Sequence, residues 1–189
     1  FEQLSVSMEV MLKSAPKAQA LLSDIKAFAA ATPFELTELA NSSKMLLAFG
    51  IESEKIIPTL GRLGDIAAGL NIPLGELAEL YGKARVQGRL FAQDVNQLTG
   101  RGIPVIQQFA KQFGVAESDV RKLVETGKIG FKNLEEAFVS MTSQGGQFFG
   151  LMEKQSTTLA GRISTLKDAF AELGRTIGGV VAPALTKLA

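Results

Sequence analysis

Carboxylate pairs are the residues of this sequence best suited to do chemistry. The three pairs are Glu52 with Glu54, Glu76 with Glu79, and Glu135 with Glu136. Two carboxylates can act as general acid and base where a pocket shifts the pKa of one of them. All three pairs lie near expected helix starts or in first turns, where acidic side chains complement the helix dipole. We therefore interpret the pairs as structural and assign no catalytic residue.

The composition excludes most other catalytic and metal chemistry. The chain has 189 residues and contains no His, Cys or Trp. Without imidazole and thiol groups it has no Ser-His or Cys-His pair, no disulfide and no His or Cys ligand for zinc. A hard cation held by oxygen atoms alone remains compatible with the sequence. We expect neither a cofactor nor a metal site.

The charge balance argues against a protein that coats nucleic acid. The chain carries 20 Lys and Arg against 19 Asp and Glu, for a formal net charge of +1. Non-specific binding to nucleic acid depends on neutralising many phosphates. The most basic stretch runs from Gly82 to Arg101, with Lys83, Arg85, Arg89 and Arg101 against Asp94. We interpret it as a solvated face rather than a phosphate-binding site.

One segment has the spacing of a DNA-binding motif. Residues 113–129 form a turn beginning FGVAESDV, followed by a helical pattern that ends in TGKI, and they resemble the helix-turn-helix of small excisionase-type DNA binders. In such motifs the second helix enters the major groove. Residues 130–136 then turn acidic where a basic wing would be needed. Because two short helices meeting at an angle give the same spacing, a structural hairpin is the simpler interpretation.

The distribution of Gly and Pro predicts many short helices instead of one rod. The chain has 19 Gly and 6 Pro, and the apolar residues between them recur at helical spacing. We expect a compact all-α array of about eight to ten short helices. Ser14 and Pro16 predict the start of one helix, residues 32–34 and Gly50 predict the two ends of the next, and Pro58 starts or kinks a third. Two further helices are expected from Pro73 toward Gly88 and from Pro104 toward Gly114. The last two of this series are expected at about Glu117 to Thr126 and about Asn133 to Gln144.

The first dozen residues fit two patterns. Leu4, Val6, Met8, Val10 and Leu12 alternate as in a strand, whereas Phe1, Leu4, Met8 and Leu12 have helical spacing. No other segment offers a clear strand partner. We therefore predict a helix.

The C-terminal segment has a heptad pattern that the rest of the chain lacks. We define the seam as the apolar residues spaced by four and three positions, namely Leu159, Ile163, Leu166, Phe170, Leu173 and Ile177. The pattern predicts a compact helical module over residues 1–156 and a long amphipathic helix over 157–189, within a single structural domain. The seam either packs on helices of the same domain or pairs with a helical partner.

Several sequence blocks, taken in order, resemble the domain of phage and prophage tail tape-measure proteins. The blocks are TPFEL from Thr32, LLAFG from Leu46, IPTL from Ile57, LGDIAAGL from Leu63, GIPV from Gly102, and the run from Gly127 to Gly174. The resemblance implies a largely helical, non-enzymatic protein that occupies the tail tube, sets tail length and leaves during DNA delivery. It also implies a place in the virion tail, and in the host bacterial cytoplasm during assembly. Tail-tube proteins, assembly chaperones and other copies of the chain would be its partners.

Two further functions remain as alternatives. Long tail proteins of this kind can carry a lytic, peptidoglycan-cleaving module, which would need an acid or a nucleophile in a cleft. The second alternative is membrane contact by residues 177–189 during delivery. Glycines, Pro183 and the single Lys187 make that segment a poor interfacial helix.

Overall fold

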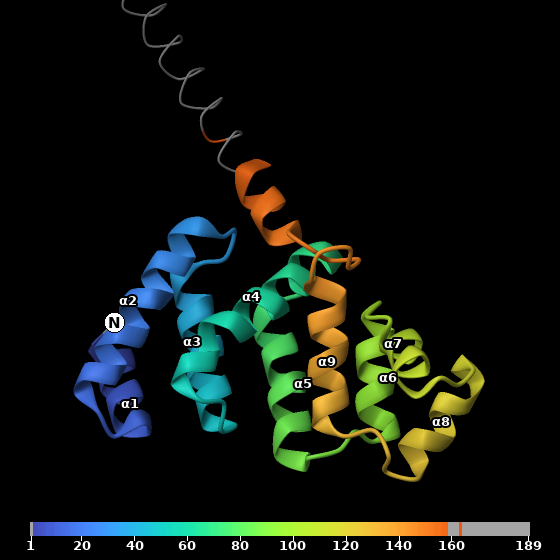
Figure 1. Cartoon of the computed structure of the whole chain (residues 1–189). Helices are drawn as coiled ribbons and strands as arrows, with labels where there is room; N and C mark the ends of the chain where they lie inside the picture. The colour runs from blue at the N-terminus through green and yellow to red at the C-terminus, as the bar shows by residue number, and fades with distance from the viewer. Residues whose placement is uncertain (1, 159–162, 164–189) are drawn as a thin grey trace, which may run out of the picture.

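The chain folds into an array of short helices. A computed structural model describes residues 2–158 and residue 163 (Figure 1), and within these residues it contains no strand. The helices in chain order are α1 (Glu2–Leu12), α2 (Ala15–Ala31), α3 (Leu36–Ala48), α4 (Ser53–Leu70), α5 (Leu74–Gln87), α6 (Ala92–Gly100), α7 (Val105–Phe113), α8 (Glu117–Glu125) and α9 (Phe131–Thr142). Residues 151–158 are also helical. The predicted all-α class is confirmed.

Local sequence determines most helix ends. The side chain of Ser14 accepts a hydrogen bond from the backbone N–H of Lys17 at 3.4 Å, which caps α2 as predicted. Gly88 and Gly114 end α5 and α7 with φ angles of +73° and +63°, a left-handed conformation that glycine adopts without strain. These ends depend on single residues and their neighbours, so the sequence predicts them well.

Three helices differ from the sequence prediction. Pro58 does not start α4, because the helix begins at Ser53 and includes the proline, which leaves the kink as the remaining prediction for this residue. α9 begins at Phe131 instead of Asn133, since the Asn133 side chain accepts a hydrogen bond from the backbone N–H of Gly130 at 2.9 Å. The sequence did not predict α6, which buries only Val95 and Leu98 and therefore has a weak apolar pattern.

α4, α5 and α9 hold the array together. In Figure 1 they lie between α1–α3 on one side and α6–α8 on the other, and α5 packs on both α3 and α9. At the α5–α9 contact the ring of Tyr81 lies 5.0 Å from that of Phe131 and 5.6 Å from that of Phe138. Burial raises the pKa of Tyr81, so its hydroxyl stays protonated. The aromatic cluster therefore joins α5 to α9.

The start of α9 is also fastened to the end of α5 by backbone hydrogen bonds. The N–H of Leu90 donates to the carbonyl of Ile129 at 2.9 Å, and the N–H of Phe131 donates to the carbonyl of Gly88 at 3.0 Å. Arg89 and Gly130 form an isolated antiparallel bridge between them.

Among the described residues, no helix has the length and apolar character needed to cross a membrane.

The helix predicted for the first dozen residues is confirmed as α1, and both apolar patterns of that segment have a structural explanation. Met8 is fully buried, and Leu4 and Leu12 pack against the core at a spacing of four residues. Val6 and Val10 are also four residues apart, but they are 56% and 70% exposed. The strand-like alternation is therefore a helix with an apolar stripe on each of two faces.

Candidate functional site

The helical segment at residues 151–158 is attached to the middle of α4 by one carboxylate. Asp65 accepts hydrogen bonds from the backbone N–H groups of Met152 at 3.0 Å and Gly150 at 3.3 Å. These N–H groups lie at the start of the segment, where a helix leaves its first N–H groups without internal partners. Asp65 therefore caps a helix that lies far from it in the sequence. We call this contact the joint.

Two glycines of α4 make room for the joint. A Cβ atom added to Gly64 would lie 2.7 Å from Sδ of Met152, and one added to Gly69 would lie 2.6 Å from a methyl carbon of Leu151. Both distances are shorter than van der Waals contact. Gly69 also faces the ring of Phe148, which is 2% exposed. The side chains of Phe148, Leu151 and Met152 therefore pack directly against the backbone of α4.

The joint also shifts the pKa of Asp65. Burial raises the pKa of this carboxyl above its ordinary value, and the hydrogen bonds from Met152 and Gly150 partly oppose that rise. The nearby charge of Glu153 raises it further. Such a group could resemble a catalytic acid, but here its oxygen atoms are occupied by backbone N–H groups. We therefore interpret Asp65 as a structural cap.

Only one seam residue lies within the described part of the chain. Ile163 is helical and 54% exposed, and it lines a hollow together with Pro33, Phe34 and Ser156. This places Ile163 beside the turn between α2 and α3. The remaining predicted seam residues lie outside the described residues: Leu159, Leu166, Phe170, Leu173 and Ile177. Residues 177–189, the segment considered for membrane contact, lie outside them as well.

The carboxylate pairs are on the surface and take part in ion pairs. Five of these carboxylates form ion pairs with basic side chains: Glu52 with Lys55, Glu54 with Lys17, Glu76 with Arg101, Glu79 with Lys83, and Glu136 with Lys132. Glu135 and Glu136 lie beyond the first turn of α9, unlike the expectation. No pair is brought together in a cleft. In the part of the chain that the structure describes, no acidic cluster suits a metal ion.

The basic stretch from Gly82 to Arg101 is not a free cationic surface. Lys83 and Arg101 form ion pairs with glutamates of α5. The guanidinium carbon of Arg89 lies 4.4 Å from the ring centre of Phe91, and that of Arg85 lies 5.5 Å from the ring centre of Phe131. Each cation of the stretch thus has a partner within the chain, which supports the structural interpretation over phosphate binding.

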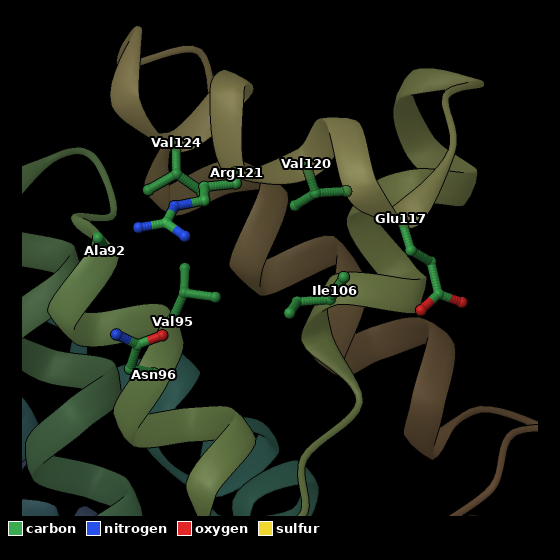
Figure 2. A pocket seen from close by; sticks show the side chains of 8 residues that line it. All are labelled: Ala92, Val95, Asn96, Ile106, Glu117, Val120, Arg121 and Val124. Carbon is green, nitrogen blue, oxygen red and sulfur yellow. The ribbon is translucent and has the colours of Figure 1, made fainter.

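The segment that resembles a helix-turn-helix forms a hairpin of α7 and α8. A hollow of about 290 Å³ lies between this hairpin and α6. Figure 2 shows Val95, Val120 and Val124 facing it. Arg121 extends over the hollow toward α6 and pairs with Glu125 within its own helix. The inner face of α8 therefore serves packing. Its outer side combines basic and acidic side chains, a poor match for a DNA backbone.

The residues of the joint were not among the predicted sites. Asp65 follows Arg62 by three residues, a spacing typical of ion pairs on an exposed helix surface, so the sequence favours an ordinary surface residue. Gly64 and Gly69 gave the stronger hint, because glycine in a helix interior costs stability unless something packs closely against it. The heptad pattern pointed to residues 159–177, which begin about two helical turns after the contact at Met152.

Comparisons with known proteins point to one family. A family model described as "Tape measure protein" matches residues 1–178. The chain is 29% identical over 131 residues to the "Probable tape measure protein" of Escherichia phage Mu, covering 68% of this chain and 19% of that protein. It is 22% identical over 156 residues to the "Mu-like prophage FluMu protein gp42" of Haemophilus influenzae, covering 79% of this chain and 24% of that protein. No solved structure matches the chain.

The two relatives are several times longer than the region they share with this chain. The chain spans about a fifth of the length of one and about a quarter of the other. The family match nevertheless includes every helix from α1 to α9, the joint and all six seam residues. With a match of this extent, the chain belongs to the tape measure protein family.

Proposed function

We propose that this chain is a folded structural module of a phage or prophage tail tape-measure protein. In this role it takes part in tail assembly and DNA delivery, and the parent protein sets tail length. The observation that carries the proposal is the family match, which extends over residues 1–178. The ion pairs of Glu52, Glu54, Glu76, Glu79 and Glu136 add support, because within the described residues these exposed carboxylates contact basic side chains and are not gathered in a cleft suited to peptidoglycan cleavage.

The module and the seam would have different tasks. Residues 1–156 form the module, and the helix over 157–189 leads away from it and carries the seam. The joint fixes residues 150–152 to α4. This attachment supports the proposal that the joint sets the direction in which the helix leaves the module. The partially exposed Ile163 offers the seam to a helical partner. Tail-tube proteins, assembly chaperones and other copies of the chain are the proposed partners, in the virion tail and in the bacterial cytoplasm during assembly.

The test places charges on the seam and compares them with charges placed beside it. Leu166→Asp with Phe170→Asp puts two carboxylates on the apolar stripe. The matched control, Ser164→Asp with Ala171→Asp, adds the same charge at positions outside the heptad spacing. Each pair is introduced into the parent gene of a producing prophage. Tails are then examined by electron microscopy, and infective particles are counted.

The proposal predicts a loss of complete tails only for the seam variant. The purified chains should unfold at similar temperatures, because the module is retained in both variants. Normal tails from the seam variant would overturn the role given to the seam. A purified chain that cleaves peptidoglycan with clear turnover would overturn the structural assignment itself.

A further inference from the structure

The outer face of α1 and the neighbouring side of α3 form an apolar surface that the described chain leaves uncovered. Val6, Val10 and Met11 are 56%, 70% and 38% exposed. Val6 and Val10 stand one helical turn apart and form a ridge along α1. A cluster of large apolar side chains on a surface indicates a contact with another molecule more often than isolated exposed residues do.

A hollow lies directly beside this ridge. It has a volume of about 690 Å³, and Met11 of α1 and Met45 and Ala48 of α3 line it together with the ridge. Methionine side chains adapt to the shape of what packs against them. The same face of the molecule thus carries an apolar ridge and an apolar hollow of matching character.

Two opposite charges accompany the ridge and the hollow. Glu9 lies next to Val6 and Val10 around α1, on the side away from Ser7 and Met11, because successive residues of a helix are 100° apart. Lys44 of α3 lines the hollow. Both side chains are exposed, and neither forms an ion pair within the part of the chain that the structure describes.

The two helices also run in the same direction. Short turns at residues 13–14 and 32–35 join α1 to α2 and α2 to α3, and each helix packs on the next. Residues 6–11 of α1 and residues 41–48 of α3 line one hollow. Glu9 and Lys44 fall near the middle of these two stretches and therefore stand at a similar height along the pair.

We propose that this face binds a second copy of the chain. A two-fold axis parallel to α1 places the ridge of each copy in the hollow of the other. The same operation brings Glu9 of each copy to Lys44 of the other, so both charges gain partners. In a symmetric two-fold interface the same patch of both copies forms the contact, so the patch must be complementary to itself. The ridge with the hollow, and Glu9 with Lys44, meet this requirement.

The first experiment measures self-association of the 189-residue chain by sedimentation over a concentration series. The wild type is expected to dimerise. Val10→Lys should abolish the dimer over the same concentrations, because it places a charge on the ridge. The matched control is Val86→Lys, which changes another exposed valine, 66% accessible, on α5. That variant should dimerise as the wild type does.

A charge exchange then tests the arrangement itself. Glu9→Lys and Lys44→Glu each put like charges together and should weaken the dimer about tenfold. The double variant exchanges both charges and should restore the wild-type dissociation constant. Circular dichroism and thermal unfolding of every variant check that the module is folded, which is expected because the altered side chains are exposed.

Three results would overturn the proposal. The wild type could remain monomeric at all concentrations. The double charge exchange could fail to restore a dimer that the single variants weaken. Finally, association could persist in Val10→Lys and disappear in Leu166→Asp with Phe170→Asp, which would place the contact on the seam. The last comparison separates this inference from the proposed function, since the seam and the α1–α3 face are altered independently.

Discussion

Asp65, in the middle of α4, accepts a hydrogen bond from the backbone N–H of Met152, a residue 87 positions later in the chain. A second bond from Gly150 reaches the other oxygen of the same carboxylate. One side chain thus supplies the cap of a helix that begins after all of α1–α9. This contact determines how the helical segment at residues 151–158 is attached to α4.

Removal of the Asp65 carboxylate should release the helical segment at residues 151–158. Asp65→Ala leaves two N–H groups without their acceptor, and we expect a loss of about 1–2 kcal/mol in the free energy of unfolding, since the site is only half-buried. Asp65→Asn keeps one acceptor oxygen and should lose less. Urea unfolding measures the loss, and hydrogen exchange at the Met152 amide locates it. Unchanged exchange at that amide in Asp65→Ala would show that the cap does not hold the segment.

The stability contributed by Asp65 should decrease as the pH rises. Burial raises the pKa of Asp65 in the folded chain above its ordinary value of 3.8, so the folded chain binds this proton more tightly than the unfolded chain does. The difference in unfolding free energy between wild type and Asp65→Asn should therefore favour the wild type more at about pH 3.5 than at about pH 6.5. A difference that grows with rising pH would contradict the direction of the shift.

Alanine substitutions at two glycines of α4 should have opposite effects. Gly61 has open space where a Cβ would stand, so Gly61→Ala should stabilise the chain by about 0.5–1 kcal/mol through helix propensity. At Gly69 the new methyl group would lie 2.6 Å from Leu151 and 2.8 Å from Phe148. Gly69→Ala should therefore be less stable than Gly61→Ala by about 1–3 kcal/mol. Equal unfolding temperatures of the two variants would mean that Leu151 and Phe148 can move to accommodate the new methyl group without loss of stability.

Duplex DNA should not bind the chain through the α7–α8 hairpin. α8 carries Glu117, Asp119 and Glu125 against Arg121 and Lys122. This excess of acidic side chains would face the phosphates of a duplex. Fluorescence anisotropy of a labelled duplex, titrated with the chain at decreasing salt, should show no affinity beyond weak non-specific binding. A steep salt dependence that indicates several phosphate contacts would restore the DNA-binding alternative.

The sequence alone determined the fold class and most helices of this protein. Ser14 caps α2 and Gly88 ends α5 because capping and left-handed glycine depend on a few neighbouring residues. Apolar spacing likewise gave α1 despite its strand-like alternation. The same local reasoning missed α6, whose short apolar face becomes evident only when α7 and α8 cover it.

Only the tertiary structure decided which contacts the chemically suitable residues make. Each cation of the basic stretch contacts a glutamate or an aromatic ring, and the other ion-paired carboxylates contact lysines elsewhere on the surface. Asp65, Gly64 and Gly69 instead form the joint. The contacts of the joint connect residues about eighty positions apart, and no local sequence pattern indicates contacts over such a separation. Spacing within a helix determines which side chains share a face, but only the packing of the helices determines what that face meets.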